Sequence, residues 1–225
     1  MHERSVACQV QGDGTPILVL AGWGGPTDKY HGLMVALASK GYSVALPDMP
    51  GLPGKTPPVM MPIEAWPQWV GGLSQALWRR PFVLVSHSLS ARIALEYLSL
   101  DSSNCLCAVF IGPWLISGPC SAAFSRLLAR AVRFVCPVVF PDMRWVFDGN
   151  VWKTAVQLIS AVRRRPTVPC LTVHGIRDPA LWLFGGWKRV GCETRKCDWG
   201  HSPQVTATSE LAAIIDEFIR GGSKR

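Results

Sequence analysis

A serine with the surroundings of a nucleophile lies near the middle of the chain. Ser88 is the centre of Ser86-His-Ser-Leu-Ser90, which follows the apolar run 82–85 and precedes a helix-like segment at 91–98. A strand, a sharp turn and a helix in this order would lift the Ser88 hydroxyl above the end of a sheet. Such a turn needs small residues two before and two after the nucleophile, and both are serines here. The pattern predicts Ser88 as a nucleophile, and a helix N-cap is the alternative.

A serine hydroxyl attacks well at neutral pH only when a base removes its proton. His201 stands in a loop before the last helix-like segment, and Asp178 stands in the loop after the apolar run 170–173. These residue types can accept the proton and orient the imidazole. Asp198 is the other acid near the base, but it is only three residues from His201 and would have difficulty reaching the far ring nitrogen. We therefore expect Asp178 to be the acid. We expect structural roles for the remaining histidines, His2, His31, His87 and His174.

The segments that would position these residues alternate between strand and helix types. Apolar runs with little polar alternation are typical of strands buried on both faces, and they cover residues 17–20, 42–46, 82–85, 106–111 and 170–173, with a last strand expected near 190–197. Helix-like segments cover residues 29–39, 63–78, 89–98 and 209–219. In the last of these, Leu211, Ile214, Ile215 and Phe218 recur at the spacing of one helix face. The predicted fold class is α/β, a mainly parallel twisted sheet with helices on both faces, in a single domain over residues 1–225.

The alternation is interrupted once, by a long helical and aromatic segment at about residues 114–169. Insertions of this length inside a compact domain usually serve as lids or binding walls. We expect a short helical cap here, with Trp114, Phe134 and Trp145 lining the substrate pocket. The alternative is that these aromatic side chains form the core of the cap itself.

The same segment carries most of the positive charge of the chain. It contains seven arginines and one lysine against two aspartates, so it holds 8 − 2 = +6 of the net charge of +8. Arg126, Arg130 and Arg133 would share one helical face. Either this face is simply solvated, or it attracts an anionic substrate, an acyl carrier or a membrane surface. We expect no nucleic acid partner, because no binding motif accompanies the charge.

Composition indicates a globular chain, with 48% hydrophobic and 17% charged residues in 225. The first residues lack the apolar run of a secretory signal, and no apolar stretch is long enough to span a membrane, so we expect a cytoplasmic protein. Eight cysteines lie mostly in apolar runs and are interpreted as reduced structural thiols, although Cys192 and Cys197 could approach each other. The spacing favours no metal site. Gly54-Lys-Thr56 lacks the earlier glycine of a phosphate-binding loop, so we expect no nucleotide and no cofactor.

With these residues assembled, the chain resembles the α/β-hydrolase superfamily, and small carboxylesterases in particular, over nearly its whole length. Val19-Leu-Ala-Gly-Trp-Gly-Gly is similar to the loop of that family that binds an oxyanion. Leu46-Pro-Asp-Met-Pro-Gly-Leu-Pro-Gly-Lys-Thr-Pro is similar to the loop after the next strand. The chain departs from the family pattern at Ala21, where histidine is usual, and at Ser86 and Ser90, where glycine is usual.

The resemblance implies the chain order nucleophile, acid, base, which Ser88, Asp178 and His201 follow. It also implies an oxyanion hole made by the backbone N–H groups of Leu89 and Trp23, with a plain tight turn as the alternative for the glycine-rich loop. The implied activity is that of a serine hydrolase that cleaves a small-molecule ester or thioester through an acyl-enzyme. Amide or carbon–carbon hydrolysis, acyl transfer and hydroxynitrile lyase chemistry use the same triad, and a ligand-binding protein with little turnover is the alternative of another class.

Overall fold

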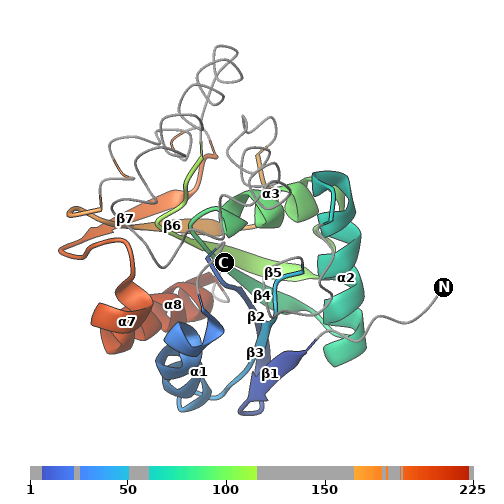
Figure 1. Cartoon of the computed structure of the whole chain (residues 1–225), viewed down its shortest axis with the longest axis horizontal. Coiled ribbons are helices and arrows are strands. Elements are labelled where there is room, and N and C mark those ends of the chain that lie inside the picture. The colour runs from blue at the N-terminus through green and yellow to red at the C-terminus, as the bar shows by residue number, and fades with distance from the viewer. Residues whose placement is uncertain are drawn as a thin grey trace.

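The computed structural model describes residues 7–22, 26–50, 61–115, 165–178, 181, 188 and 190–222. Its centre is one sheet of seven strands in the order β1-β3-β2-β4-β5-β6-β7 (Figure 1). The strands are β1 (Cys8–Gln11), β2 (Thr15–Leu20), β3 (Tyr42–Pro47), β4 (Phe82–His87), β5 (Cys105–Ile111), β6 (Cys170–Gly175) and β7 (Glu193–Cys197). Only β1 runs antiparallel to its neighbour, and the other pairs are parallel. The carboxyl ends of the six parallel strands therefore meet at one edge of the sheet.

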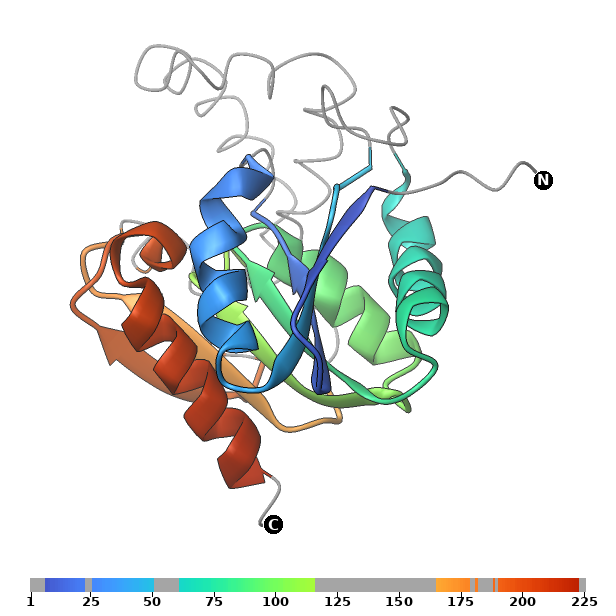
Figure 2. The same ribbon diagram turned by 90° about the horizontal axis from the view of Figure 1, so that it is seen from below.

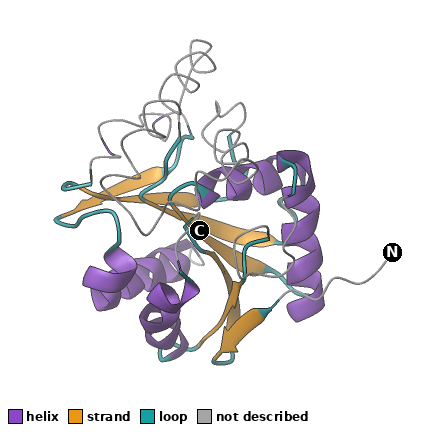
Figure 3. Cartoon of the chain, in the orientation of Figure 1, coloured by secondary structure: helices purple, strands orange, loops and turns teal. Residues whose placement is uncertain are grey.

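Helices cover both faces of this sheet (Figures 2 and 3). They are α1 (His31–Ala38), α2 (Trp66–Leu77), α3 (Ser90–Leu100), α7 (Pro203–Thr206) and α8 (Thr208–Gly222), with 3-10 turns at Thr27–Tyr30 and Ile63–Ala65. Helices α1 and α8 pack together on one face, and α2 and α3 pack together on the other. In α8, the predicted stripe faces the core, since Leu211, Ile214 and Ile215 are buried and Phe218 is partly buried and packs against the core.

The core consists of the strands themselves, because both of their faces are covered. Every residue of β3 and β4 is buried, as are nearly all of those in β2, β5 and β6. This explains why the sequence of these strands is a continuous apolar run and not an alternating one. The outer strand β7 carries Glu193, Arg195 and Lys196, charges that discourage pairing with another sheet.

The predicted fold class is confirmed, and the predicted strands and helices are present with shifted ends. The segment predicted as one helix at 29–39 begins instead as the 3-10 turn Thr27–Tyr30 before α1. The predicted cap at 114–169 lies outside the described residues except for its two ends, and so do Phe134, Trp145 and the three arginines Arg126, Arg130 and Arg133. No helix of the described ranges is long and apolar enough to cross a membrane.

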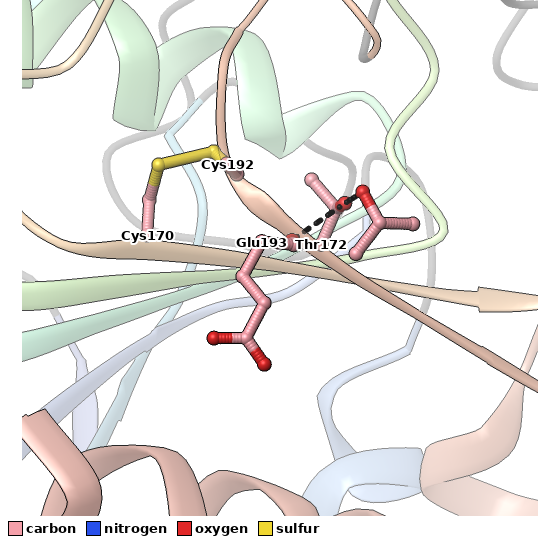
Figure 4. The surroundings of a disulfide bond; sticks show 5 residues. Cys170, Thr172, Cys192 and Glu193 are labelled. Carbon is pink, nitrogen blue, oxygen red and sulfur yellow. Dashed lines mark hydrogen bonds between the residues drawn. A yellow bond between two sulfur atoms is a disulfide. The ribbon is translucent and has the colours of Figure 1, made fainter.

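The interpretation of all cysteines as reduced thiols is wrong for two of them. Cys170 and Cys192 form a disulfide with Cα atoms 4.8 Å apart (Figure 4). The cause is the register of β6 and β7, which pairs Leu171 with Glu193 and so places the two preceding cysteines side by side. Cys192 therefore does not pair with Cys197. The free thiols among the described cysteines are Cys8, Cys105, Cys107 and Cys197.

Candidate active site

Ser88 lies in the tight turn between β4 and α3, at the carboxyl edge of the sheet. Its φ angle is 57°, and within the described residues only Arg79 is another non-glycine residue with positive φ. This left-handed conformation is costly for a residue with a side chain and is found where surrounding structure enforces it. Here the enforcement includes a hydrogen bond from the Ser88 N–H to the carbonyl oxygen of Ile111, 2.9 Å away on β5.

His201 and Asp178 come from two other loops and meet at Ser88. Nε2 of His201 lies 3.0 Å from Oγ of Ser88, and Nδ1 lies 2.6 Å from Oδ2 of Asp178. Asp178 is almost completely buried in the loop after β6. A buried carboxylate accepts hydrogen bonds, so Nδ1 of His201 donates to it and Nε2 is left to accept the hydroxyl proton of Ser88. The structure thus brings together the three residues that the sequence singled out.

Asp198 points elsewhere, although it is much closer to His201 in sequence. Its carboxylate makes a bidentate ion pair with the guanidinium of Arg177, and both side chains are about two thirds exposed. The Arg177 guanidinium also lowers the pKa of Asp198. The described contacts therefore support Asp178, and not Asp198, as the partner of the imidazole.

Two glycines that no sequence motif marked, Gly112 and Gly175, make room for this cluster. A Cβ atom on Gly112, where φ is +47°, would lie 3.1 Å from Oδ2 of Asp178 and 3.3 Å from Nδ1 of His201. A Cβ atom on Gly175 would collide with the backbone carbonyls of Trp199 and Gly200, which lead to His201. Both glycines directly end or follow a buried strand, which is the sequence signal that could have identified them.

The two serines that lie two residues before and two residues after Ser88, Ser86 and Ser90, are fully buried and behave differently. Oγ of Ser90 donates to the carbonyl oxygen of Ala21 at 2.5 Å, which ties α3 to the end of the β2 segment. Oγ of Ser86 has no hydrogen-bond partner among the described residues. The turn therefore accepts a hydroxymethyl group at both positions and uses only one of the hydroxyls.

His87, interpreted from the sequence as structural, connects several parts of the site. Its Nδ1 lies 2.6 Å from the hydroxyl of Tyr30, and its Nε2 lies 2.8 Å from the carbonyl oxygen of His201. The same Tyr30 hydroxyl accepts a hydrogen bond from the N–H of Gly22 at 2.6 Å. Burial lowers the pKa of His87 to about 3, so this ring is neutral.

Of the two predicted oxyanion donors, the structure describes one. Leu89 directly follows Ser88 at the start of α3, and no described residue accepts a hydrogen bond from its N–H. Trp23 lies outside the described residues, whereas Gly22 before it is described. Of the predicted pocket residues, Trp114 lies at the site. Its backbone N–H donates to the backbone carbonyl oxygen of Ser88 at 3.3 Å, and the centre of its ring lies 5.0 Å from that of the His201 ring.

This arrangement can remove a proton from a serine hydroxyl and return it to a leaving group. A buried carboxylate, an imidazole and a hydroxyl are connected in series, and the hydroxyl stands at a helix N-terminus where developing negative charge is stabilised. No group of three His, Cys, Asp or Glu side chains within the described part of the chain could hold a metal ion.

The model of a known family matches this chain over residues 15–144, and that family is described as having the alpha/beta hydrolase fold. The match covers more than half of the chain and includes the turn that carries Ser88. The chain belongs to the alpha/beta hydrolase family. Asp178 and His201 lie beyond the matched range, so their identification rests on the hydrogen bonds to and from the imidazole.

Solved structures share this fold at low sequence identity. The enol-lactonase from Burkholderia xenovorans LB400 is 18% identical, with 97% of this chain and 98% of that chain covered and a TM-score of 0.71. The thioesterase domain from the curacin biosynthetic pathway is 14% identical, with 96% of each chain covered and a TM-score of 0.68. A thermophilic esterase from Thermogutta terrifontis is 17% identical, with 96% and 93% covered and a TM-score of 0.66. A search of curated proteins finds no match.

Proposed function

We propose that this alpha/beta hydrolase is a serine hydrolase that cleaves a carboxylic ester or thioester through an acyl-enzyme on Ser88. The observation that carries the proposal is the series of hydrogen bonds from Ser88 through His201 to Asp178, with the nucleophile held at a φ of 57°. Structural requirements of this kind are not met by an ordinary buried serine, which has neither the strained backbone nor the oriented base.

In the first half-reaction, Oγ of Ser88 attacks the carbonyl carbon as Nε2 of His201 takes the hydroxyl proton. The tetrahedral intermediate collapses, and the bond to the leaving oxygen or sulfur breaks while the imidazolium returns the proton to that atom. Water then repeats the sequence on the acyl-enzyme and releases the acid. Asp178 holds the imidazole in the required tautomer throughout and stays ionised.

The oxyanion of this intermediate needs two preorganised donors. The Leu89 N–H, which has no acceptor among the described residues, is one proposed donor, and the N–H of Trp23 is the other. Trp114 is the proposed wall beside the base because its ring lies against His201. Phe134 and Trp145 are proposed to extend the pocket on the strength of the sequence alone.

The choice of ester or thioester as substrate class follows from chemistry that the structural neighbours share by name. A lactonase, a thioesterase and an esterase all act on an acyl carbonyl with an oxygen or sulfur leaving group. Each of these leaving groups departs readily from a tetrahedral intermediate when the imidazolium supplies a proton. For the partner we propose a small molecule. The +6 charge of residues 114–169 would attract an anionic substrate, an acyl carrier or a membrane surface, and a simply solvated face is the alternative.

The proposal is tested by stopped-flow measurement of p-nitrophenol release from a short-chain p-nitrophenyl ester. We expect an initial burst stoichiometric with enzyme, its loss in Ser88→Ala, and covalent labelling of Ser88 by a fluorophosphonate probe. Ser86→Ala is the matched control, because this serine is two residues away and its hydroxyl has no partner among the described residues. Undiminished labelling of Ser88→Ala would show that another residue is the nucleophile, and ligand binding without turnover would favour the binding protein.

A further inference from the structure

Three hydrogen bonds join the main chain on either side of the candidate active site through two buried side chains. The Gly22 N–H lies 2.6 Å from the hydroxyl of Tyr30, this hydroxyl lies 2.6 Å from Nδ1 of His87, and Nε2 of His87 lies 2.8 Å from the carbonyl oxygen of His201. Tyr30 is 1% exposed and His87 is 5% exposed. Gly22 and Tyr30 are eight residues apart, whereas His87 is 57 residues from Tyr30 and 114 residues from His201.

The chemistry of the two ends fixes the direction of every bond in this series. A carbonyl oxygen can only accept a hydrogen bond, so Nε2 of His87 carries a proton and donates a hydrogen bond to the backbone carbonyl oxygen of His201. A neutral imidazole then has a bare Nδ1, which accepts from the Tyr30 hydroxyl. The tyrosine oxygen in turn accepts from the Gly22 N–H, which can only donate. Burial keeps the His87 ring neutral, so it has no second proton that would reverse the middle bond.

Both ends of the series attach to parts of the chain that the proposed chemistry uses. One end is the peptide carbonyl of His201, the proposed base, and the rings of His87 and His201 lie 4.9 Å apart. The other end is Gly22, directly before the proposed oxyanion donor Trp23. Space at this end is so restricted that a Cβ atom on Gly22 would lie 2.6 Å from Nδ1 of His87.

We propose that His87 and Tyr30 are positioning residues, which fix the main chain of His201 and of Gly22 in position relative to Ser88. Among the described residues neither side chain makes a hydrogen bond to Oγ of Ser88, so we assign them an action through the main chain of His201 and Gly22. This inference rests on the proposed function, since it assigns a role in the reaction of Ser88. Fixing a base in place matters because small displacements from the reactive geometry slow a reaction strongly.

Two substitutions of His87 distinguish its hydrogen bond with Tyr30 from its hydrogen bond with the His201 carbonyl oxygen. The amide of His87→Asn lies near the former Nδ1, so it can accept from Tyr30 but does not reach the His201 carbonyl. The amide of His87→Gln lies near the former Nε2, so it can still donate to that carbonyl. Tyr30→Phe removes the hydroxyl and leaves the Gly22 N–H without its acceptor. Tyr97→Phe is the matched control, because Tyr97 is also buried and its hydroxyl makes no hydrogen bond among the described residues.

The experiment measures the rate of Ser88 labelling by a fluorophosphonate over a range of probe concentrations. We expect His87→Asn and Tyr30→Phe to lower the maximum labelling rate roughly 10- to 100-fold, with little change in the half-saturating concentration. His87→Gln should retain more of this rate than His87→Asn, and Tyr97→Phe should match the wild type. Thermal unfolding by circular dichroism checks that each variant is folded.

A second measurement needs no variant. Long-range ¹H–¹⁵N NMR of the wild-type chain reports the tautomer of His87, and we expect Nε2–H throughout the range from pH 5 to 8. A proton on Nδ1 instead would overturn the proposal, because Nε2 could not then donate to His201. Wild-type labelling rates in both His87→Asn and Tyr30→Phe would also overturn it while leaving the proposed function intact. A wild-type chain that is not labelled at all would refute the proposed function itself, and the positioning role with it.

Discussion

The hydroxyl oxygen of Ser90 lies 2.5 Å from the carbonyl oxygen of Ala21, and both residues are buried. Ser90 stands where the family usually has glycine, and Ala21 stands where it usually has histidine. The two departures are therefore in contact, and the serine of the turn binds the end of the segment that leads to Gly22 and Trp23. A glycine at position 90 could not make this bond.

We expect Ser90→Ala to destabilise the protein by about 1–3 kcal/mol, because the buried Ala21 carbonyl would lose the hydrogen bond from Ser90. Its labelling rate should also fall, since the start of the proposed oxyanion loop would be less constrained. Ser86→Ala is the matched comparison and should be neutral or slightly stabilising, because it removes a buried hydroxyl that has no partner among the described residues. Urea denaturation of both variants measures the difference, and equal effects would show that the Ser90 bond contributes nothing.

Asp178→Asn should reduce turnover of a p-nitrophenyl ester by roughly 10⁴-fold, because an amide favours the wrong tautomer of the imidazole. The fold should be retained, since asparagine has nearly the same shape. Asp198→Asn should change turnover little, because this carboxylate pairs with Arg177 in an exposed position. Steady-state kinetics of the two variants provide the test, and the opposite ranking would transfer the acid role to Asp198.

Gly112→Ala should lower both stability and turnover. An alanine at φ +47° costs about 1–2 kcal/mol in backbone energy, and its Cβ would press on Asp178 and His201 at the same time. Gly72→Ala is the control, since Gly72 lies in α2 with nothing within 4 Å of the added atom. That variant should gain about 0.5–1 kcal/mol from helix propensity. Thermal unfolding and ester hydrolysis measured side by side distinguish the two, and a Gly112→Ala enzyme of full activity would contradict the expected crowding.

The sequence was sufficient for the fold because strands buried on both faces must be continuous apolar runs. It also singled out Ser88, Asp178 and His201, which hydrogen bonds connect in series, since each follows or precedes a recognisable element and has a residue type suited to one chemical task. What escaped prediction depends on register. The contact of Tyr30 with His87, 57 residues apart, requires knowing how the turn before α1 lies against β4.

The disulfide escaped prediction for the same reason. Cys170 and Cys192 are adjacent only because β6 and β7 are neighbours in one particular register, and neither residue's local sequence reveals that register. Gly112 and Gly175 escaped prediction in the same way as the disulfide. Each is important because atoms of distant loops lie close to it, and not because of its own turn. The family's usual glycines at positions 86 and 90 gave no indication of what a serine hydroxyl would contact there.

Removal of the disulfide should destabilise the protein by about 3 kcal/mol, the loop-closure value for two cysteines that are 22 residues apart. The closed loop contains Asp178, so turnover should become more sensitive to temperature as well. Cys192→Ser is the variant and Cys197→Ser the control, because Cys197 is a free thiol. In urea denaturation, dithiothreitol should shift the unfolding midpoint of the wild type towards that of Cys192→Ser. A wild-type unfolding midpoint insensitive to dithiothreitol would contradict this expectation.

Because two histidines are buried, we expect the protein to lose stability in mild acid. Burial lowers the pKa of His87 to about 3 and that of His174 to about 4, from an ordinary value of 6.5. Between pH 6.5 and about 4 the unfolded chain therefore binds protons that the folded chain does not. Stability is fully present above the unfolded value and falls as the pH decreases through this window, by up to about 1.4 kcal/mol per pH unit for each histidine. The free energy of unfolding in urea at a series of pH values measures this slope. His87→Gln removes one of the two groups, so its slope should be shallower than that of the wild type even if its stability at pH 7 is lower. A variant with an unchanged slope would show that His87 is not held neutral by the folded chain.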